Sequence, residues 1–120
     1  MNGKVYARRK SERLIYDVII QCSKYISEQK VNIYESPLVI QVMNISKEGL
    51  CISTTEVFKK GAVLEFDIAL EDKLYKSISG TIVWSITNEN GNEYGLHINN
   101  ITGKFGTHIY MIESRLSMII

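Results

Sequence analysis

The chain has 120 residues, which is enough for one domain and leaves no room for a second hydrophobic core. Hydrophobic residues make up 45% and charged residues 22%, the balance of an ordinary soluble globular protein. No apolar run approaches the roughly 18 residues of a membrane helix, so we expect no membrane insertion. The first six residues lack the apolar core of a signal peptide, and we therefore expect a cytoplasmic protein.

The net charge of +1 conceals a basic N-terminus. Residues 1–13 have a net charge of +4, which leaves −3 for the rest of the chain. They contain little to bury, so we expect a flexible arm. A cationic arm on a mildly acidic body favours a local anion site over an extended nucleic-acid surface, although a solvated basic tail has the same composition. The arm's basic residues are Lys4, Arg8, Arg9, Lys10 and Arg13, against the single acid Glu12.

Alternation of apolar and polar residues predicts a series of short strands after the arm. We expect them over residues 14–22, 38–43, 50–54, 64–70, 74–86 and 93–98. In the first strand the predicted inward residues are Leu14, Tyr16, Val18, Ile20 and Cys22. In 64–70 we expect Leu64, Phe66, Ile68 and Leu70 on one face, with Glu65, Asp67 and Ala69 on the other.

Proline and turn-forming residues separate these strands. Pro37 is expected to open the second strand, where its missing N–H is tolerated. Turns are predicted at 44–49, at 71–73 and at 88–92, where an Asn-Gly pair favours a hairpin. Residues 23–36 fit two alternatives: they continue the first strand and return through a turn, or they form a short helical excursion.

The last part of the chain changes period. Apolar residues recur every three or four positions, which predicts an amphipathic helix from about residue 102. They are Ile101, Phe105, Ile109, Ile112 and Leu116. Short antiparallel strands followed by one helix predict an all-β fold, a small closed or nearly closed barrel with the C-terminal helix packed against it.

Two short motifs suggest where chemistry takes place. Arg9 and Arg13 are four residues apart on the arm, and guanidinium groups can grip phosphates with two parallel hydrogen bonds and stack on aromatic bases. Asn44, Ser46 and Gly49 follow in the predicted turn. An amide and a hydroxyl suit a base edge and a phosphate, and glycine allows a positive φ or a close backbone approach. The same residue types also suit an ordinary β-turn.

In this order, Arg-x-x-x-Arg followed by Asn-x-Ser-x-x-Gly resembles the signature of the PilZ domain family, the bacterial receptors for the second messenger cyclic di-GMP. The segments Gly80–Trp84 and Tyr94–Ile98 also resemble late strands of that family, and the likeness covers about residues 8–116. It implies a six-stranded antiparallel barrel with a C-terminal helix. The predicted organisation is thus an arm over residues 1–13 and a barrel with its helix over residues 14–120.

Carried over to this chain, the resemblance implies that Arg9 and Arg13 grip phosphates and stack on guanine. Asn44 and Ser46 would bond the guanine and phosphate face, and Gly49 would shape the turn. Many family members have aspartate at the position of Asn44, and an amide lacks the paired acceptor oxygens of a carboxylate, so the affinity could be lower. Arg8 precedes the motif, and in the family a long cationic residue there accompanies an intercalated pair of ligands. Arg8, with Lys10 as a possible addition, therefore predicts two ligands per protomer.

Other reactive side chains are assigned packing or surface roles. Cys22 and Cys51 lie in apolar strand-like runs and are expected to be reduced, without a disulfide. His97 and His108 show no metal-ligand spacing, and Trp84 is expected in the core or at its rim rather than against a ligand. No serine–histidine–acid set stands out, so we expect no catalysis, no metal and no cofactor.

The predicted mechanism is a disorder-to-order switch, in which the ligand fixes the arm over the barrel and changes the surface seen by a downstream protein. The resemblance suggests control of motility, or of adhesion and polysaccharide in biofilms. One alternative is a PilZ-like adaptor that binds protein and no nucleotide. A second is a small barrel that binds single-stranded nucleic acid, which the acidic body disfavours.

Overall fold

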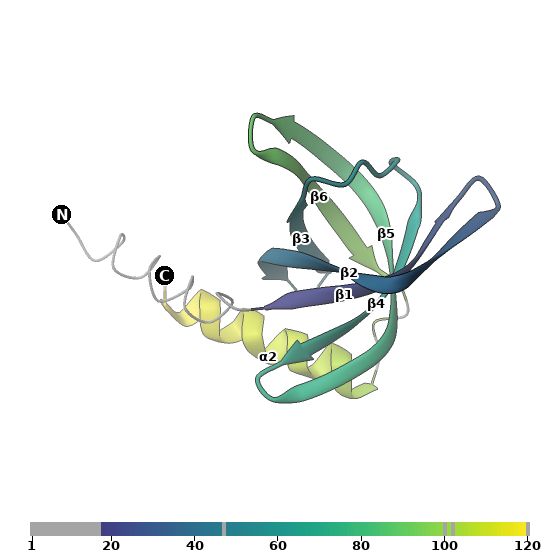
Figure 1. Cartoon of the computed structure of the whole chain (residues 1–120). Coiled ribbons are helices and arrows are strands. Elements are labelled where there is room, and N and C mark those ends of the chain that lie inside the picture. The colour runs from purple at the N-terminus through teal and green to yellow at the C-terminus, as the bar shows by residue number, and fades with distance from the viewer. Residues whose placement is uncertain (1–17, 47, 100, 102, 120) are drawn as a thin grey trace.

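The structure, a computed structural model, describes residues 18–46, 48–99, 101 and 103–119, with helix side chains up to Arg115. Six antiparallel strands close into a barrel in the order β1-β2-β3-β6-β5-β4 (Figure 1). They are β1 (Ile19–Ser27), β2 (Lys30–Ser46), β3 (Gly49–Thr54), β4 (Val63–Leu70), β5 (Lys73–Asn88) and β6 (Gly91–Ile98). The predicted barrel is confirmed.

The barrel consists of two three-stranded meanders. Strands β1 to β3 form the first and β4 to β6 the second, and each is built from consecutive antiparallel neighbours. The two meanders meet at the β3–β6 pairing and at the β1–β4 pairing, which closes the barrel. Closure leaves neither meander with a free edge along these pairings.

Residues 23–36 follow the first of the two predicted alternatives. Strand β1 continues to Ser27, turns at Glu28 and Gln29, and returns as β2. Both turn residues have positive φ, which matches the right-handed twist of a two-residue hairpin.

The prediction that Pro37 opens the second strand is wrong, because β2 begins at Lys30 and runs through it. The β1–β2 register shifts beside this proline: Cys22 faces Leu38, whereas Lys24 faces Ile33. Proline is compatible with such an irregularity, since it lies where the ladder hydrogen bonds are interrupted. On its other side β2 pairs with β3 only from Gln41 onward.

The predicted turn at 44–49 is shorter than expected. Strand β2 extends to Ser46 and β3 starts at Gly49, so Asn44 lies in a strand and not in a turn. The hairpins expected at 71–73 and 88–92 are confirmed, with Glu71 and Asp72 joining β4 to β5 and Glu89 and Asn90 joining β5 to β6.

The inward-facing side chains fill the barrel with apolar atoms. Ile20 and Cys22 are buried as predicted, Val18 packs against the core from its edge, and the predictions for Leu14 and Tyr16 fall outside the described residues. The alternation expected along β4 is also confirmed. The buried set is Ile20, Cys22, Ile40, Val42, Ile45, Leu50, Ile52, Phe58, Ala62, Leu64, Phe66, Ile68, Leu70, Ile82, Tyr94, Leu96, Ile98, Phe105, Ile109 and Ile112.

Helix α2 (Gly103–Ile119) lies along the outside of the barrel in Figure 1 and adds one apolar stripe to this core. Phe105, Ile109 and Ile112 are buried, and Ile101 packs at the edge, as the periodicity predicted. The side chain of Leu116 lies outside the described part. Among the described residues, no helix has the length and apolarity to cross a membrane.

A polar network ties α2 to the turn between β4 and β5. Arg115 donates from both terminal nitrogens to the Glu71 carboxylate, one bond being 2.7 Å long. His108 Nε2 donates to the same carboxylate over 2.8 Å, and the Tyr75 hydroxyl lies 2.7 Å from His108 Nδ1. The hydrogen bonds from Arg115, followed by the one from His108, lower the pKa of Glu71 to about 2. The helix is therefore held to the barrel by charge as well as by apolar contact.

Candidate ligand-binding site

A β-bulge in β2 turns the motif residues outward. Val42 pairs with Ile52 and Asn44 pairs with Cys51, so Met43 is the extra residue. Val42 is 1% exposed and Ile45 is 2% exposed, while Met43 and Asn44 are both exposed. Without the extra residue, strict alternation would point Asn44 into the core. The bulge thus places Asn44 and Ser46 on the outer face.

Strand β5 contains a matching bulge. Ile82 pairs with Leu96 and Trp84 with Gly95, which makes Val83 the extra residue. Ile82 is buried and Trp84 is 39% exposed, so the indole lies on the outside of the barrel. The same reversal that exposes Asn44 therefore exposes Trp84.

Strand pairing arranges the outward residues in two rows across β2, β3, β6 and β5. The first row runs Asn44, Cys51, Gly95, Trp84, and each member pairs with the next. The second row runs Ser46, Gly49, His97, Thr81 in the same way. At roughly 4.8 Å between neighbouring strands, each row is about 14 Å long, and the rows lie about 7 Å apart along the strands.

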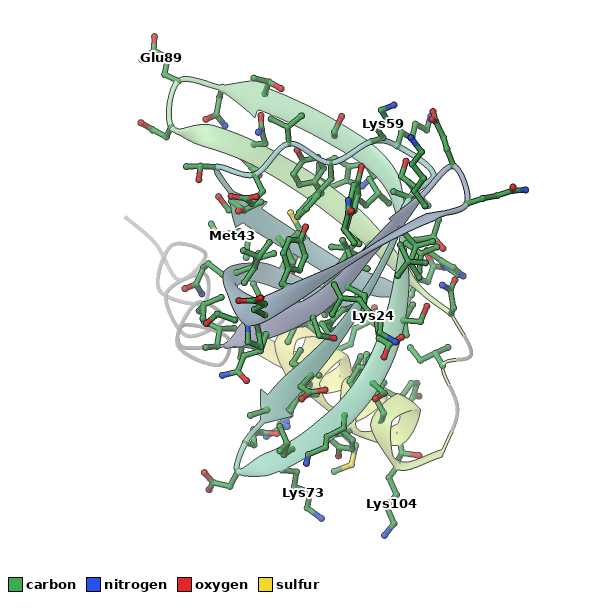
Figure 2. The ribbon with its side chains drawn as sticks, turned by 45° about the vertical axis from the view of Figure 1, so that its right-hand side comes forward. Lys24, Met43, Lys59, Lys73, Glu89 and Lys104 are labelled. Atoms are coloured by element: carbon green, nitrogen blue, oxygen red, sulfur yellow. The ribbon has the colours of Figure 1, made fainter. Side chains whose placement is uncertain are left out.

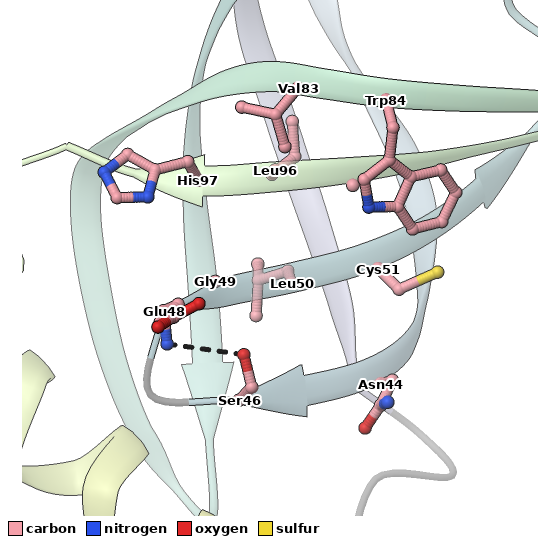
Figure 3. A pocket seen from close by; sticks show the side chains of 11 residues that line it. Asn44, Ser46, Glu48, Gly49, Leu50, Cys51, Val83, Trp84, Leu96 and His97 are labelled. Carbon is pink, nitrogen blue, oxygen red and sulfur yellow. Dashed lines mark hydrogen bonds between the residues drawn. The ribbon is translucent and has the colours of Figure 1, made fainter.

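All members of these rows except Thr81 line a hollow of about 260 Å³ on the barrel's outer face. Figure 3 shows Asn44 and Trp84 toward one end, and Ser46 with His97 toward the other. The full lining is Asn44, Ser46, Glu48, Gly49, Leu50, Cys51, Val83, Trp84, Gly95, Leu96 and His97.

Local hydrogen bonds orient the two polar motif residues. Asn44 Oδ1 accepts the backbone N–H of Ile45 over 2.8 Å, which leaves the amide Nδ2 as the group that can donate outward. Ser46 Oγ accepts the backbone N–H of Glu48 over 3.3 Å (Figure 3). That bond uses an acceptor position of the hydroxyl and leaves its proton to donate. Both side chains therefore present donors, which suit carbonyl and phosphate oxygens.

Gly49 is required by packing and not by backbone torsion. It is not among the glycines with positive φ, so the torsional reason for a glycine does not apply here. A Cβ at this position would collide with the backbone oxygen of Leu96 on β6. Residue 49 is therefore glycine because only glycine allows the backbones of β3 and β6 to approach so closely.

The described residues of the pocket do not include the positively charged side chains that the predicted site requires. None of the described lining residues is lysine or arginine, and Glu48 contributes a carboxylate beside Ser46. The predicted arm residues Arg8, Arg9, Lys10 and Arg13 lie outside the described residues.

A comparison with protein-family models identifies the family to which the chain belongs. The model described as the PilZ domain matches residues 7–111, which include both sequence motifs, all six strands and the first half of α2. The chain belongs to the PilZ domain family. A comparison with curated proteins finds no match.

PilZ domains in general bind cyclic di-GMP, and they are receptors rather than enzymes. The hollow of this PilZ domain contains the three described residues that the family pattern singles out, Asn44, Ser46 and Gly49. No group of three histidine, cysteine or acidic side chains suited to a metal ion occurs within the described ranges.

Several further residues of the PilZ pocket were not predicted from the sequence, and four of them have polar, ionisable or aromatic side chains. Trp84, Cys51, His97 and Glu48 line it, whereas the sequence suggested packing or surface roles for the first three. Both cysteines are free, as expected, but only Cys22 is a core residue. Burial raises the pKa of the Cys51 thiol, and the nearby Glu93 carboxylate raises it further. The pairing of β3 with β6 brings these residues together, and no local sequence signal encodes that pairing.

Proposed function

We propose that this PilZ domain is a cyclic di-GMP receptor that binds its ligand between the pocket and the N-terminal arm. One observation carries the proposal: the bulges gather Asn44, Ser46 and Gly49 with an exposed tryptophan in one outward hollow. Together with the family's general ligand, that arrangement supports a site for a nucleotide with flat bases and phosphate oxygens.

In this proposal each side chain has a separate role. The Asn44 amide donates to an acceptor on the guanine edge, and the Ser46 hydroxyl donates to a phosphate oxygen. The exposed face of Trp84 stacks on a guanine, a contact worth about 1–3 kcal/mol per base. Gly49 keeps β3 close to β6, so that both rows of the pocket stay in register.

The arm supplies the positive charge. A hollow of about 260 Å³ falls below the roughly 300–1,000 Å³ of typical small-molecule sites, and the described residues that line it include no lysine or arginine. Arg9 and Arg13 grip phosphates and stack on guanine, and Arg8, with Lys10 as a possible addition, neutralises a second ligand. The expected stoichiometry is two ligands per protomer.

Binding acts as an ordering switch. Fixing about ten arm residues costs roughly 1–2 kcal/mol each, and the contacts with the ligand offset that cost. The ordered arm creates a new surface that a downstream protein recognises, in bacterial control of motility or biofilm formation, in the cytoplasm.

Glu48 favours one alternative function. Its carboxylate lines the hollow and would repel phosphates, which fits a PilZ-type adaptor that contacts proteins and no nucleotide.

Calorimetric titration of cyclic di-GMP tests the proposal. The wild type should release heat and saturate at two ligands per chain. Arg9→Ala should weaken binding by about 10- to 100-fold, because a charge-assisted hydrogen bond contributes about 1.5–3 kcal/mol. Arg8→Ala should saturate at one ligand. Lys30→Ala, at the exposed β1–β2 turn, is the matched control and should bind as the wild type does.

Two results would overturn parts of the proposal. A folded wild type that binds no cyclic di-GMP would leave the adaptor alternative, and saturation at one ligand would remove the role of Arg8. Hydrogen exchange over residues 5–14 that does not change with saturating ligand would remove the switch. Tight binding to a single-stranded oligonucleotide, with a steep salt dependence, would instead indicate a nucleic-acid function.

A further inference from the structure

A second groove lies between α2 and the start of β5. Lys73 and Tyr75 line it from the strand, and Gly103, Lys104, Thr107, His108 and Met111 line it from the helix, around a volume of about 640 Å³. We call it the helix groove. It shares no lining residue with the pocket of the proposed nucleotide site.

Several contacts hold the floor of the helix groove in place. The Tyr75 ring packs on Phe105 with 5.1 Å between ring centroids and meets the His108 ring edge-on at 5.7 Å. The Tyr75 hydroxyl and His108 are also hydrogen-bonded, and His108 is fixed in turn by Glu71. A floor held on several sides keeps its shape without a ligand, which lowers the ordering cost of docking.

The charge at the mouth is positive. The Glu71 carboxylate beneath the floor is already matched by the two hydrogen bonds from Arg115. Lys73 and Lys104 form no hydrogen bond or ion pair within the part of the chain that the structure describes, and Figure 2 shows both side chains projecting from the same side of the molecule. Asp72 is exposed in the neighbouring turn but does not line the groove.

An exposed apolar side chain lies beside the two lysines. Met111 lines the helix groove and is 55% exposed. Methionine adapts its shape to different apolar partners, so Met111 is suited to contact an apolar side chain of a bound segment.

We propose that the helix groove docks a short segment of a partner protein in which apolar side chains are flanked by carboxylates. The apolar side chains would cover Met111 and Tyr75, and the carboxylates would pair with Lys73 and Lys104. A concave site suits an extended or helical peptide, whereas a planar anionic membrane cannot enter it. The inference rests on the proposed function only in that a receptor needs a partner on which to act.

The test uses the full chain, labelled with ¹⁵N, and the acetylated peptide Asp-Glu-Leu-Phe-Glu-Asp as the probe. Amide shifts should change at Lys73, Tyr75, Thr107 and Met111. Lys73→Glu and Lys104→Glu should each weaken binding by about three- to tenfold, since each replaces an attraction by a repulsion. Lys60→Glu, an exposed lysine outside both sites, should bind as the wild type does.

Two control peptides separate the contribution of the carboxylates to binding from that of the apolar side chains. Asn-Gln-Leu-Phe-Gln-Asn lacks the charges and Asp-Glu-Ser-Ser-Glu-Asp lacks the apolar groups, and both should bind more weakly than the first peptide. Equal binding of either control, unchanged affinity in the lysine variants, or no shift with the first peptide would overturn the proposal. So would binding to phosphatidylserine vesicles without peptide binding, which would indicate a membrane contact.

The peptide-docking proposal and the cyclic di-GMP proposal can be refuted independently of each other. Both lysine variants should keep the cyclic di-GMP titration of the wild type, and Arg9→Ala should keep the peptide affinity. A protein that binds the peptide but not cyclic di-GMP would retain the groove and lose the receptor function.

Discussion

The indole ring of Trp84 lies directly over Gly95 on the neighbouring strand, so that a Cβ at residue 95 would collide with the indole Nε1. The indole ring therefore occupies the space that a side chain at residue 95 would fill, and its position depends on glycine at residue 95. Glycine beneath an aromatic on a paired strand is a known way to stabilise a sheet locally.

Gly95→Ala should displace the indole and weaken cyclic di-GMP binding by about threefold or more, because the stacking face is lost in part. Trp84 is the only tryptophan of the chain, so its fluorescence reports the change without added labels. The emission maximum should shift in the variant and stay unchanged in Ser85→Ala, the exposed neighbour. Identical spectra for Gly95→Ala and the wild type would contradict the described packing.

Gly49→Ala should destabilise the barrel by about 1–3 kcal/mol, near the upper end, because the added Cβ meets backbone and not a movable side chain. Urea unfolding followed by circular dichroism measures the loss. Ser53→Ala, on the same strand, is the control and should change stability by less. A fully stable Gly49→Ala protein would show that β3 and β6 can separate at this point.

Cys51 and Cys22 should differ in reactivity although both are free. Cys22 is fully buried and its pKa is raised by burial to about 11, whereas Cys51 is partly exposed in the pocket of the proposed nucleotide site. A thiol reagent should therefore label one cysteine in the native protein and two in denaturant, and labelling should quicken as pH rises. Cyclic di-GMP should slow the native reaction, and Cys51→Ser should abolish it. If Cys51 reacted with the reagent at the same rate with and without ligand, the ligand would have to bind elsewhere.

The Glu71 network should make stability depend on acid pH. The pKa of Glu71 is lowered from its usual value of 4.5 to about 2, mainly by the hydrogen bonds from Arg115. A carboxyl with a lowered pKa in the folded state contributes stability above 4.5, and this contribution is lost as the pH falls toward 2. The side chain is 39% exposed and solvent screens the pair, so we expect about 1 kcal/mol.

Glu71→Gln tests that contribution. The variant should be less stable than the wild type at pH 7, and the difference should shrink between pH 4.5 and pH 2 in urea titrations. Glu89→Gln, in the exposed β5–β6 turn, is the control and should show no such convergence. A constant difference at all pH values would point to packing and not to charge.

Much of this fold follows from local sequence patterns. The alternation along Leu64–Leu70 and the three-to-four periodicity of Phe105, Ile109 and Ile112 each predict one buried face, and each face is buried. Alternation is informative there because neither segment is interrupted within its apolar series. The barrel and its helix follow from counting such segments.

The rest of the fold depends on features that the alternation of apolar and polar residues does not reveal. The extra residues Met43 and Val83 reverse the facing of the strand residues after them, so simple alternation does not reveal that Asn44 and Trp84 point outward. The turn at Glu28 and Gln29 uses positive φ without glycine or asparagine, so no turn signal marks it. The contact of Glu71 with Arg115 joins residues far apart in sequence, and only the folded barrel brings them together.

The β3–β6 pairing also divides the pocket of the proposed nucleotide site between two parts of one polypeptide. Asn44 and Ser46 belong to the first meander, Trp84 and His97 to the second, and a single crossing segment around Lys59 joins the two covalently. A chain opened at that segment would become two complementary fragments, each holding half of the pocket. A nucleotide that contacts both halves would favour their association by mass action. The same barrel could then serve as a split sensor, with reassembly of the fragments as its output.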